Sequence, residues 1–205
     1  MSKYSRWWKV PWRPAGTYET TLFTPDLSYT VPADGWANME DLAGNFLLLP
    51  PGADLDDVDA GTADYLGVYT SVAAPEGCTD TPLRDGGPTS AQSFAEWLGQ
   101  QAGLEVSEPQ PVTVDGFSGV VVDIAATGEM PCSDGDLDFL PVLVGVDPSS
   151  LAHAVIPGYS LRLYLLDHAD GILAIEIADA PNGGSDSTDW FADASEVADA
   201  LNFTT

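Results

Sequence analysis

The sequence predicts a single α+β domain in which an antiparallel sheet of about six to eight strands is packed by two amphipathic helices. Short alternating or continuous apolar segments, separated by turns rich in Pro and Gly, predict the strands, whereas two segments carry apolar residues at helical spacing. With 205 residues and 44% hydrophobic content, the chain can bury one core. We expect residues 16–205 to form this domain.

The first part of the domain predicts several strands. Residues 18–23 and 27–31 alternate between apolar and polar side chains, as half-buried strands do. Residues 46–49 form a continuous apolar run that ends at two prolines, which indicates a strand covered on both faces. Residues 65–70 return to β-type composition. Trp36, which follows a turn, is expected to anchor a strand end in the core.

Two segments predict helices. Thr89 with Gln92, and Ser93 with Glu96, have the spacing of a capping box, and the apolar residues behind them stop near Gly103. The apolar stripe of this first helix should lie on the sheet. The second helix is predicted from apolar residues at intervals of four, three and four: Trp190, Ala194, Val197 and Leu201.

Two hairpins are predicted in the second part. Asp115-Gly116 suits the positive φ values of a two-residue type I′ turn within residues 112–117, with a return strand over residues 120–124. Asp170-Gly171 predicts the second turn, between strands at residues 161–166 and 172–177, and a further strand covers residues 139–146. If those two residues alone form the second loop, Arg162 faces Asp179 in a structural salt bridge.

The charge distribution separates the start of the chain from the rest. Four of the six basic residues lie in the first thirteen positions and alternate with tryptophans: Lys3, Arg6, Lys9 and Arg13 with Trp7, Trp8 and Trp12. All 32 acidic residues follow, so the body would repel phosphate backbones and no nucleic-acid partner is expected. Residues 1–15 are predicted to form a flexible leader. Its composition suits contact with a membrane surface, a protein partner or the acidic body itself.

Cys78 and Cys132 are the only cysteines, and both lie in polar, turn-rich stretches. One disulfide between them would stabilise the fold by closing a long loop, and the alternative is two free thiols in a reducing cytosol. No apolar run reaches the length of a membrane-spanning helix, and the N-terminus has no signal-peptide core. We expect an extracytoplasmic or cell-surface location if an upstream targeting segment was removed, and otherwise a cytoplasmic location in a high-salt setting.

A resemblance covers most of residues 16–203. The run from Gly16 through Phe23-Thr-Pro to Gly35-Trp36 resembles the opening of extracytoplasmic bacterial domains with the Mog1/PsbP-like fold, including actinobacterial LpqN-type lipoproteins. The Val-Asp-Gly hairpin at residues 114–116 and a terminal helix closing with Leu201-Asn-Phe203 fit the same order of elements. The resemblance implies a binding or accessory role and supplies no catalytic residue. The lipobox cysteine of the lipoprotein pattern is not in this sequence.

Two acidic loops are candidates for a metal site. Carboxylates are the ligands that Ca²⁺ requires, but neither loop has EF-hand spacing. Solvated acidic loops are therefore the expectation, no cofactor is predicted, and a Ca²⁺-dependent acidic binding domain is the alternative. The residues are Asp54, Asp56, Asp57 and Asp59 in the first loop, and Asp134, Asp136 and Asp138 in the second.

Catalytic residues are scarce in this sequence. A hydrolytic triad needs an imidazole to move a proton, and only His153 and His168 are present. His168 follows Asp167 at a predicted turn, and no nucleophile elbow occurs in the sequence. We predict that the protein is not an enzyme, and a hydrolase using His168 or His153 is the least favoured alternative.

The expected function is a non-enzymatic, extracytoplasmic binding or accessory module with an unknown ligand. Several aromatic side chains could line a groove between sheet and helix, although a place in the core is the more common role of such residues. These residues are Trp36, Tyr65, Tyr69, Trp97, Tyr159 and Tyr164. The tryptophans of the leader are expected to be exposed and to mark an interface.

Overall fold

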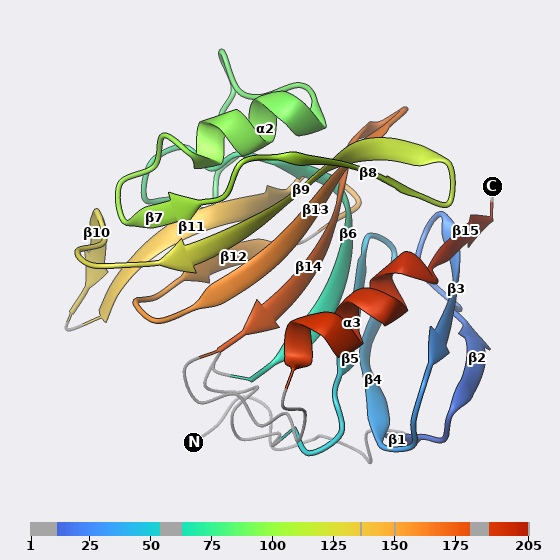
Figure 1. The fold of residues 1–205 in the computed structure, drawn as a ribbon. Coiled ribbons are helices and arrows are strands. Elements are labelled where there is room, and N and C mark those ends of the chain that lie inside the picture. Colours follow the sequence, from blue (N-terminus) through green and yellow to red (C-terminus); the bar gives the residue numbers. More distant parts are fainter. Residues whose placement is uncertain (1–11, 54–62, 136, 150, 181–188, 205) are drawn as a thin grey trace.

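Two antiparallel sheets and two helices make up the part of the chain that the computed structural model describes, namely residues 12–53, 63–135, 137–149, 151–180 and 189–204. Twelve strands belong to the large sheet and three to the small one (Figure 1). The central order of the large sheet is β1 (Trp12–Arg13), β4 (Trp36–Leu42), β5 (Asn45–Leu49), β6 (Tyr65–Ala73), β14 (Gly171–Asp179), β13 (Ser160–His168), β9 (Phe117–Ala126) and β7 (Leu104–Val106).

The remaining strands extend this arrangement at its sides. In the large sheet, β8 (Gln110–Val114) pairs with β9, while β11 (Leu137–Gly145) pairs with the end of β6, with β12 (Ala152–Val155) and with β10 (Cys132–Asp134). The small sheet has β3 (Asp26–Val31) between β2 (Gly16–Glu19) and β15 (Asn202–Thr204). The predicted α+β class is confirmed, but the prediction of six to eight strands is wrong. The additional strands are mostly two to four residues long and lack the alternation that reveals a half-buried strand.

Both predicted helices exist, with different ends. α2 (Ala91–Leu98) begins after Ser90, whose side chain accepts a hydrogen bond from the backbone of Ser93, so the capping box is Ser90 with Ser93 rather than the predicted pairs. α3 spans Trp190–Asp199. It does not close with Leu201-Asn-Phe203 as expected, because the chain enters β15 at Asn202.

The two helices cover opposite faces of the large sheet (Figure 1). On one face, α2 packs over β9 and β13 and buries Phe94 and Leu98. On the other face, α3 packs on β14 and buries Trp190 against Trp36, with ring centroids 5.8 Å apart. The small sheet adds Leu27, Phe203 and other apolar residues to this second core. The large sheet is therefore sandwiched between two apolar layers.

One predicted hairpin is confirmed in detail and the other is shifted. Val114 pairs with Phe117, and Asp115 and Gly116 have φ values of 45° and 85°, as a type I′ turn requires. In the β13–β14 hairpin, however, His168 pairs with Gly171, so Ala169-Asp170 form the loop. Gly171, with φ of 128°, belongs to the strand end and not to the loop.

The shifted register changes the partner of Arg162. Arg162 faces Ile177 on β14, and the predicted salt bridge to Asp179 is therefore wrong. On its other side, Arg162 pairs with Asp123 of β9, and Arg162 Nε lies 2.7 Å from Asp123 Oδ1. The prediction extended β13 by one residue, to Ala169, whereas the strand ends at His168.

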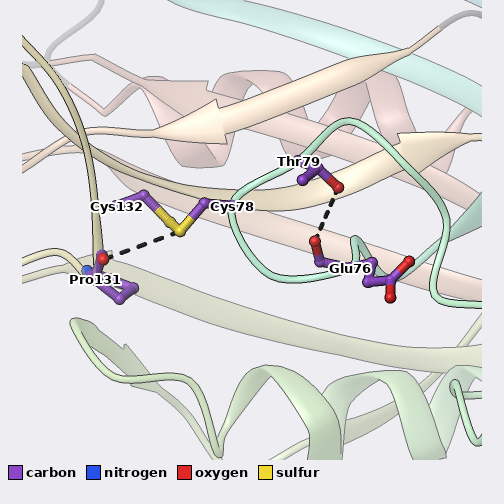
Figure 2. Close-up of a disulfide and its surroundings, with 5 residues drawn as sticks. All are labelled: Glu76, Cys78, Thr79, Pro131 and Cys132. Carbon is purple, nitrogen blue, oxygen red and sulfur yellow. Dashed lines mark hydrogen bonds between the residues drawn. A yellow bond between two sulfur atoms is a disulfide. The ribbon is translucent and has the colours of Figure 1, made fainter.

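The disulfide prediction is confirmed: Cys78 and Cys132 are joined, with their Cα atoms 5.6 Å apart and 54 positions apart in the sequence. Figure 2 shows the bond tying the loop after β6 to the start of β10. In that loop, the Thr79 hydroxyl donates a hydrogen bond of 2.8 Å to the carbonyl oxygen of Glu76. Cys132 is buried whereas Cys78 is exposed.

Part of the expected leader is ordered. Trp12 and Arg13 form β1 on the edge of β4, and the Arg13 guanidinium lies 4.9 Å from the ring centroid of Tyr18. Trp12 is 50% exposed, as expected of a leader tryptophan. Residues 1–11, with the other basic and Trp residues of the leader, lie outside the described part. None of the described helices is long and apolar enough to span a bilayer.

Candidate functional site

A groove opens where the two sheets meet, at the end of the β13–β14 hairpin. Its volume is about 680 Å³, compared with about 420 and 310 Å³ for two other cavities beside β9. Five separate segments line it: Thr24, Pro25 and Asp26; Thr70 and Ser71; Val146, Asp147 and Pro148; His168 and Asp170; and Thr204. A concave surface of this size is typical of a ligand site.

A carboxylate on the large sheet holds one wall of the groove. Asp41 of β4 accepts hydrogen bonds from the backbone N–H groups of Thr21, Leu22 and Phe23, and from the Thr21 hydroxyl. Burial alone would raise the pKa of Asp41, but these hydrogen bonds lower it overall. The ionised Asp41 therefore fixes the segment that leads into Thr24 and Asp26.

The floor of the groove contains an unusual backbone conformation. Ser71, near the end of β6, has φ of 54°, in the left-handed region that a residue with a Cβ rarely adopts. The register between β6 and β14 shifts at the same place, between Ile172 and Ala174. The Ser71 carbonyl oxygen accepts a hydrogen bond of 2.7 Å from Val146, which ties the opposite wall to the floor. Such strained positions persist where the surrounding structure fixes them, and they cluster at binding sites.

The groove is lined by negative charge. Asp26, Asp147 and Asp170 are exposed, and the lining residues include neither Lys nor Arg. His168 Nδ1 accepts a hydrogen bond of 3.3 Å from the backbone N–H of Asp170, and its ring lies 5.3 Å from that of Phe117.

A second polar cluster lies inside the protein and is formed by side chains of β6, β12 and β14. The Glu176 side chain, on β14, is completely buried, and its Oε1 lies 2.7 Å from His153 Nδ1, which forms an ion pair with it when the imidazole is protonated, although this nitrogen has no hydrogen-bond partner. The Tyr65 hydroxyl donates to Glu176 Oε1 at 3.1 Å and lies 3.1 Å from His153 Nε2. Glu176 Oε2 has no hydrogen-bond partner. Removing a partner from such a buried ion pair is costly.

A glycine makes room for this cluster in the sheet. Gly67 of β6 faces Glu176 on β14, and a Cβ at Gly67 would overlap the hydroxyl of Tyr69. Tyr65, Gly67 and Tyr69 lie on the same side of β6, so both phenols lean over the gap beside Glu176. The cluster therefore depends on a small residue at position 67.

The tyrosines of this cluster predict a loss of stability at high pH. Burial, and next the charge of Glu176, raises the pKa of Tyr65 and Tyr69 well above the usual 10, and the same causes raise the pKa of Tyr159 to about 12. Above pH 10 these groups ionise in the unfolded chain but stay protonated in the folded protein. The free energy of unfolding should therefore fall by about 1.4 kcal/mol per pH unit for each tyrosine.

Urea unfolding between pH 8 and pH 11 measures this dependence. We expect the contribution of these tyrosines to the free energy of unfolding to be constant below pH 10 and to fall steeply above it. Above pH 10 the tyrosines ionise in the unfolded chain, which stabilises that state, whereas their raised pKa keeps them neutral in the folded protein. The Tyr65→Phe variant releases one proton fewer on unfolding, so its free energy of unfolding should fall less steeply with pH. Equal slopes for the variant and the original protein would contradict this interpretation.

The structure separates the two histidines considered as catalytic candidates. His168 lines the groove, whereas Asp167 beside it accepts a hydrogen bond of 2.7 Å from the backbone N–H of Ala91 at the start of α2. His153 has an acidic partner, Glu176, and a phenol, Tyr65. An imidazole, a carboxylate and a hydroxyl thus converge at His153, but around a fully buried carboxylate.

Two of the acidic candidates for Ca²⁺, Asp134 and Asp138, are not among the residues that line the groove. Asp134 and Asp138 are exposed on either side of the β10–β11 turn. Within the described ranges, no group of three or more His, Cys, Asp or Glu side chains could hold a metal ion. Asp54, Asp56, Asp57, Asp59 and Asp136 fall outside those ranges, so the Ca²⁺ alternative stays a prediction.

The aromatic candidates are mainly core residues. Tyr69 and Tyr159 belong to the core beneath α2, where Tyr65 and Trp97 are partly buried, and Trp36 and Tyr164 belong to the core beneath α3. None of them lines the groove described above. Glu176 was not among the predicted site residues, although a lone acid within the apolar run of residues 172–178 indicates a buried polar partner.

The fold and the groove define an antiparallel α+β protein with a concave acidic site at one sheet end. No family model matches the sequence, and no curated protein matches it. One similar solved structure is cyanobacterial PsbP (CyanoP) from Synechocystis sp. PCC 6803, with a TM-score of 0.40 and 12% identity over 94% of this chain and 95% of that chain.

Another similar structure comes from Bacteroides thetaiotaomicron VPI-5482. Its TM-score is 0.38, with 13% identity over 87% of this chain. The present chain spans 45% of the length of that protein. The first structure is named as a PsbP. The narrower likeness to LpqN-type lipoproteins stays a prediction.

Proposed function

We propose that this protein is a non-enzymatic, extracytoplasmic binding module whose recognition site is the groove between the two sheets. The observation that carries the proposal is the groove itself: about 680 Å³, lined by polar side chains, and held in shape by Asp41 and by the strained Ser71. Preformed concave sites with a few placed polar groups are the usual form of a ligand site.

The disulfide supports the extracytoplasmic part of the proposal. Bonds such as Cys78–Cys132 persist in oxidising compartments and are rare where glutathione keeps thiols reduced. Because Cys78 is exposed, a reductant could reach the bond in a reducing compartment. Fractionating the source cells and measuring the thiol state of the protein would test the location.

Binding to the groove can be tested before the natural ligand is known. Amide NMR shifts of the labelled protein are recorded with separate mixtures of cationic, neutral and anionic small molecules. At least one mixture should shift the amides of groove residues such as Ser71 and Asp170. If no mixture shifts them, the proposal is refuted.

Two tryptophan substitutions give a matched comparison. Val146 is 43% exposed and lines the groove, whereas Leu137 is 53% exposed at the opposite end of β11. Val146→Trp should fill the groove and abolish the shifts, and Leu137→Trp should leave them unchanged. Loss of binding in both variants would place the binding surface elsewhere.

A hydrolase remains the second candidate, and the convergence of His153, Glu176 and Tyr65 is the observation that favours it. The burial of Glu176 opposes it, because a substrate must reach the reacting groups. Any hydrolytic activity detected with the purified protein should be abolished by His153→Ala if this candidate is correct. Activity that survives both His153→Ala and His168→Ala would reject it.

A further inference from the structure

The carboxylates of the groove stand at three separate points on its walls. Asp26 begins β3, Asp147 follows β11, and Asp170 lies in the β13–β14 loop. All three are exposed, and neither Lys nor Arg is among the lining residues. The groove therefore favours positive charge and opposes anions.

The spread of these carboxylates bears on the kind of cation. A single metal ion requires several oxygen ligands within about 2.6 Å. The described residues contain no group of three acidic, His or Cys side chains near enough for that geometry. Separate carboxylates are instead matched by separate positive charges along a chain, each forming its own charge-assisted hydrogen bond.

An unpaired hydroxyl gives an independent sign of a ligand. Thr70 is 4% exposed and lines the groove, yet its Oγ1 has no hydrogen-bond partner. Leu66 and Val68 of the same strand pack in the core that the small sheet covers, so alternation along β6 turns Thr70 toward the space between the sheets. Buried hydroxyls are normally hydrogen-bonded, and this one is left with an acceptor for an incoming N–H donor.

Resting on the proposed function, we propose that the groove binds an organic polycation, a chain carrying two or more ammonium or guanidinium groups. Two of its charges pair with Asp147 and Asp170, and one N–H donates to the hydroxyl of Thr70.

The test is calorimetric titration of the complete protein with spermidine at low ionic strength. Asp147→Asn combined with Asp170→Asn should weaken binding by about tenfold or more, because two charge-assisted contacts are lost. The matched control is Asp134→Asn with Asp138→Asn, which removes the same charge from the exposed β10–β11 turn. If both double variants lose the same affinity for spermidine, net charge alone explains the loss and the proposal is overturned.

Thr70→Val probes the hydroxyl without changing charge. Because the hydroxyl has no hydrogen-bond partner in the free protein, we expect the variant to fold normally. The amide NMR signals of the groove should then be unchanged, except at the residues next to position 70. Its affinity for spermidine should nevertheless fall by about threefold or more. Unchanged affinity would remove Thr70 from the site and contradict the proposal.

One further outcome separates the hypotheses. If neutral or anionic mixtures shift the groove amides but spermidine gives no heat, the binding module stands and the polycation inference falls.

Discussion

Replacing both cysteines by alanine is expected to lower the free energy of unfolding by about 4 kcal/mol. The Cys78–Cys132 bond closes a loop of 54 residues, and the entropy that this loop would regain in the unfolded chain accounts for a loss of that size. The strands β6 and β10 that flank the bond are separated along the chain by α2 and by the β8–β9 hairpin. The bond therefore constrains a large part of the unfolded chain.

Urea unfolding with and without a reductant measures this effect. Reduction should destabilise the original protein by about the same amount, and the double alanine variant should be insensitive to the reductant. Since Cys132 is buried, Cys78→Ala with Cys132→Val is a second variant that limits the cavity at this position. A double variant within about 1 kcal/mol of the original protein would show that the bond contributes little.

The second large effect is expected at the buried ion pair. His153→Ala should destabilise the protein by about 3–5 kcal/mol, because it removes the group that lies 2.7 Å from the completely buried side chain of Glu176. Glu176→Gln in the same background removes the buried charge and should recover part of that loss. Urea unfolding of the two single variants and the double variant gives the coupling free energy.

An exposed ion pair is the control for this measurement. Asp123 and Arg162 also form a salt bridge, but their side chains are 53% and 29% exposed. Asp123→Ala should cost about 1 kcal/mol or less. If His153→Ala costs no more than Asp123→Ala, then His153 and Glu176 are not a coupled charged pair.

The sequence predicted the elements whose patterns are strong. Apolar residues at helical spacing located α2 and α3, and Asp115-Gly116 located one turn to the residue. The second hairpin was shifted because Gly171 has a positive φ value within the strand end, so a Gly did not mark the loop. β12 and β15 were missed because three or four residues cannot show a period.

The site was less predictable than the fold, because no single segment contains it. His168 and Asp170 were recognised as neighbours of a turn, but their position opposite Asp26 and Asp147 depends on the pairing of distant strands. The buried pair at Glu176 has the same origin, since His153 reaches it from another strand. Local sequence patterns do not show which distant strands pair, so they could not predict these contacts.

The groove has five walls that are far apart in the sequence, from Thr24 to Thr204. They come together only when the small sheet, the β13–β14 hairpin and the end of β11 are all docked. Occupancy of the site is therefore thermodynamically linked to completion of the whole tertiary structure, and any ligand that fits should raise the melting temperature in proportion to the logarithm of its concentration. Conversely, trimming the last strand should empty the site while most of the large sheet persists.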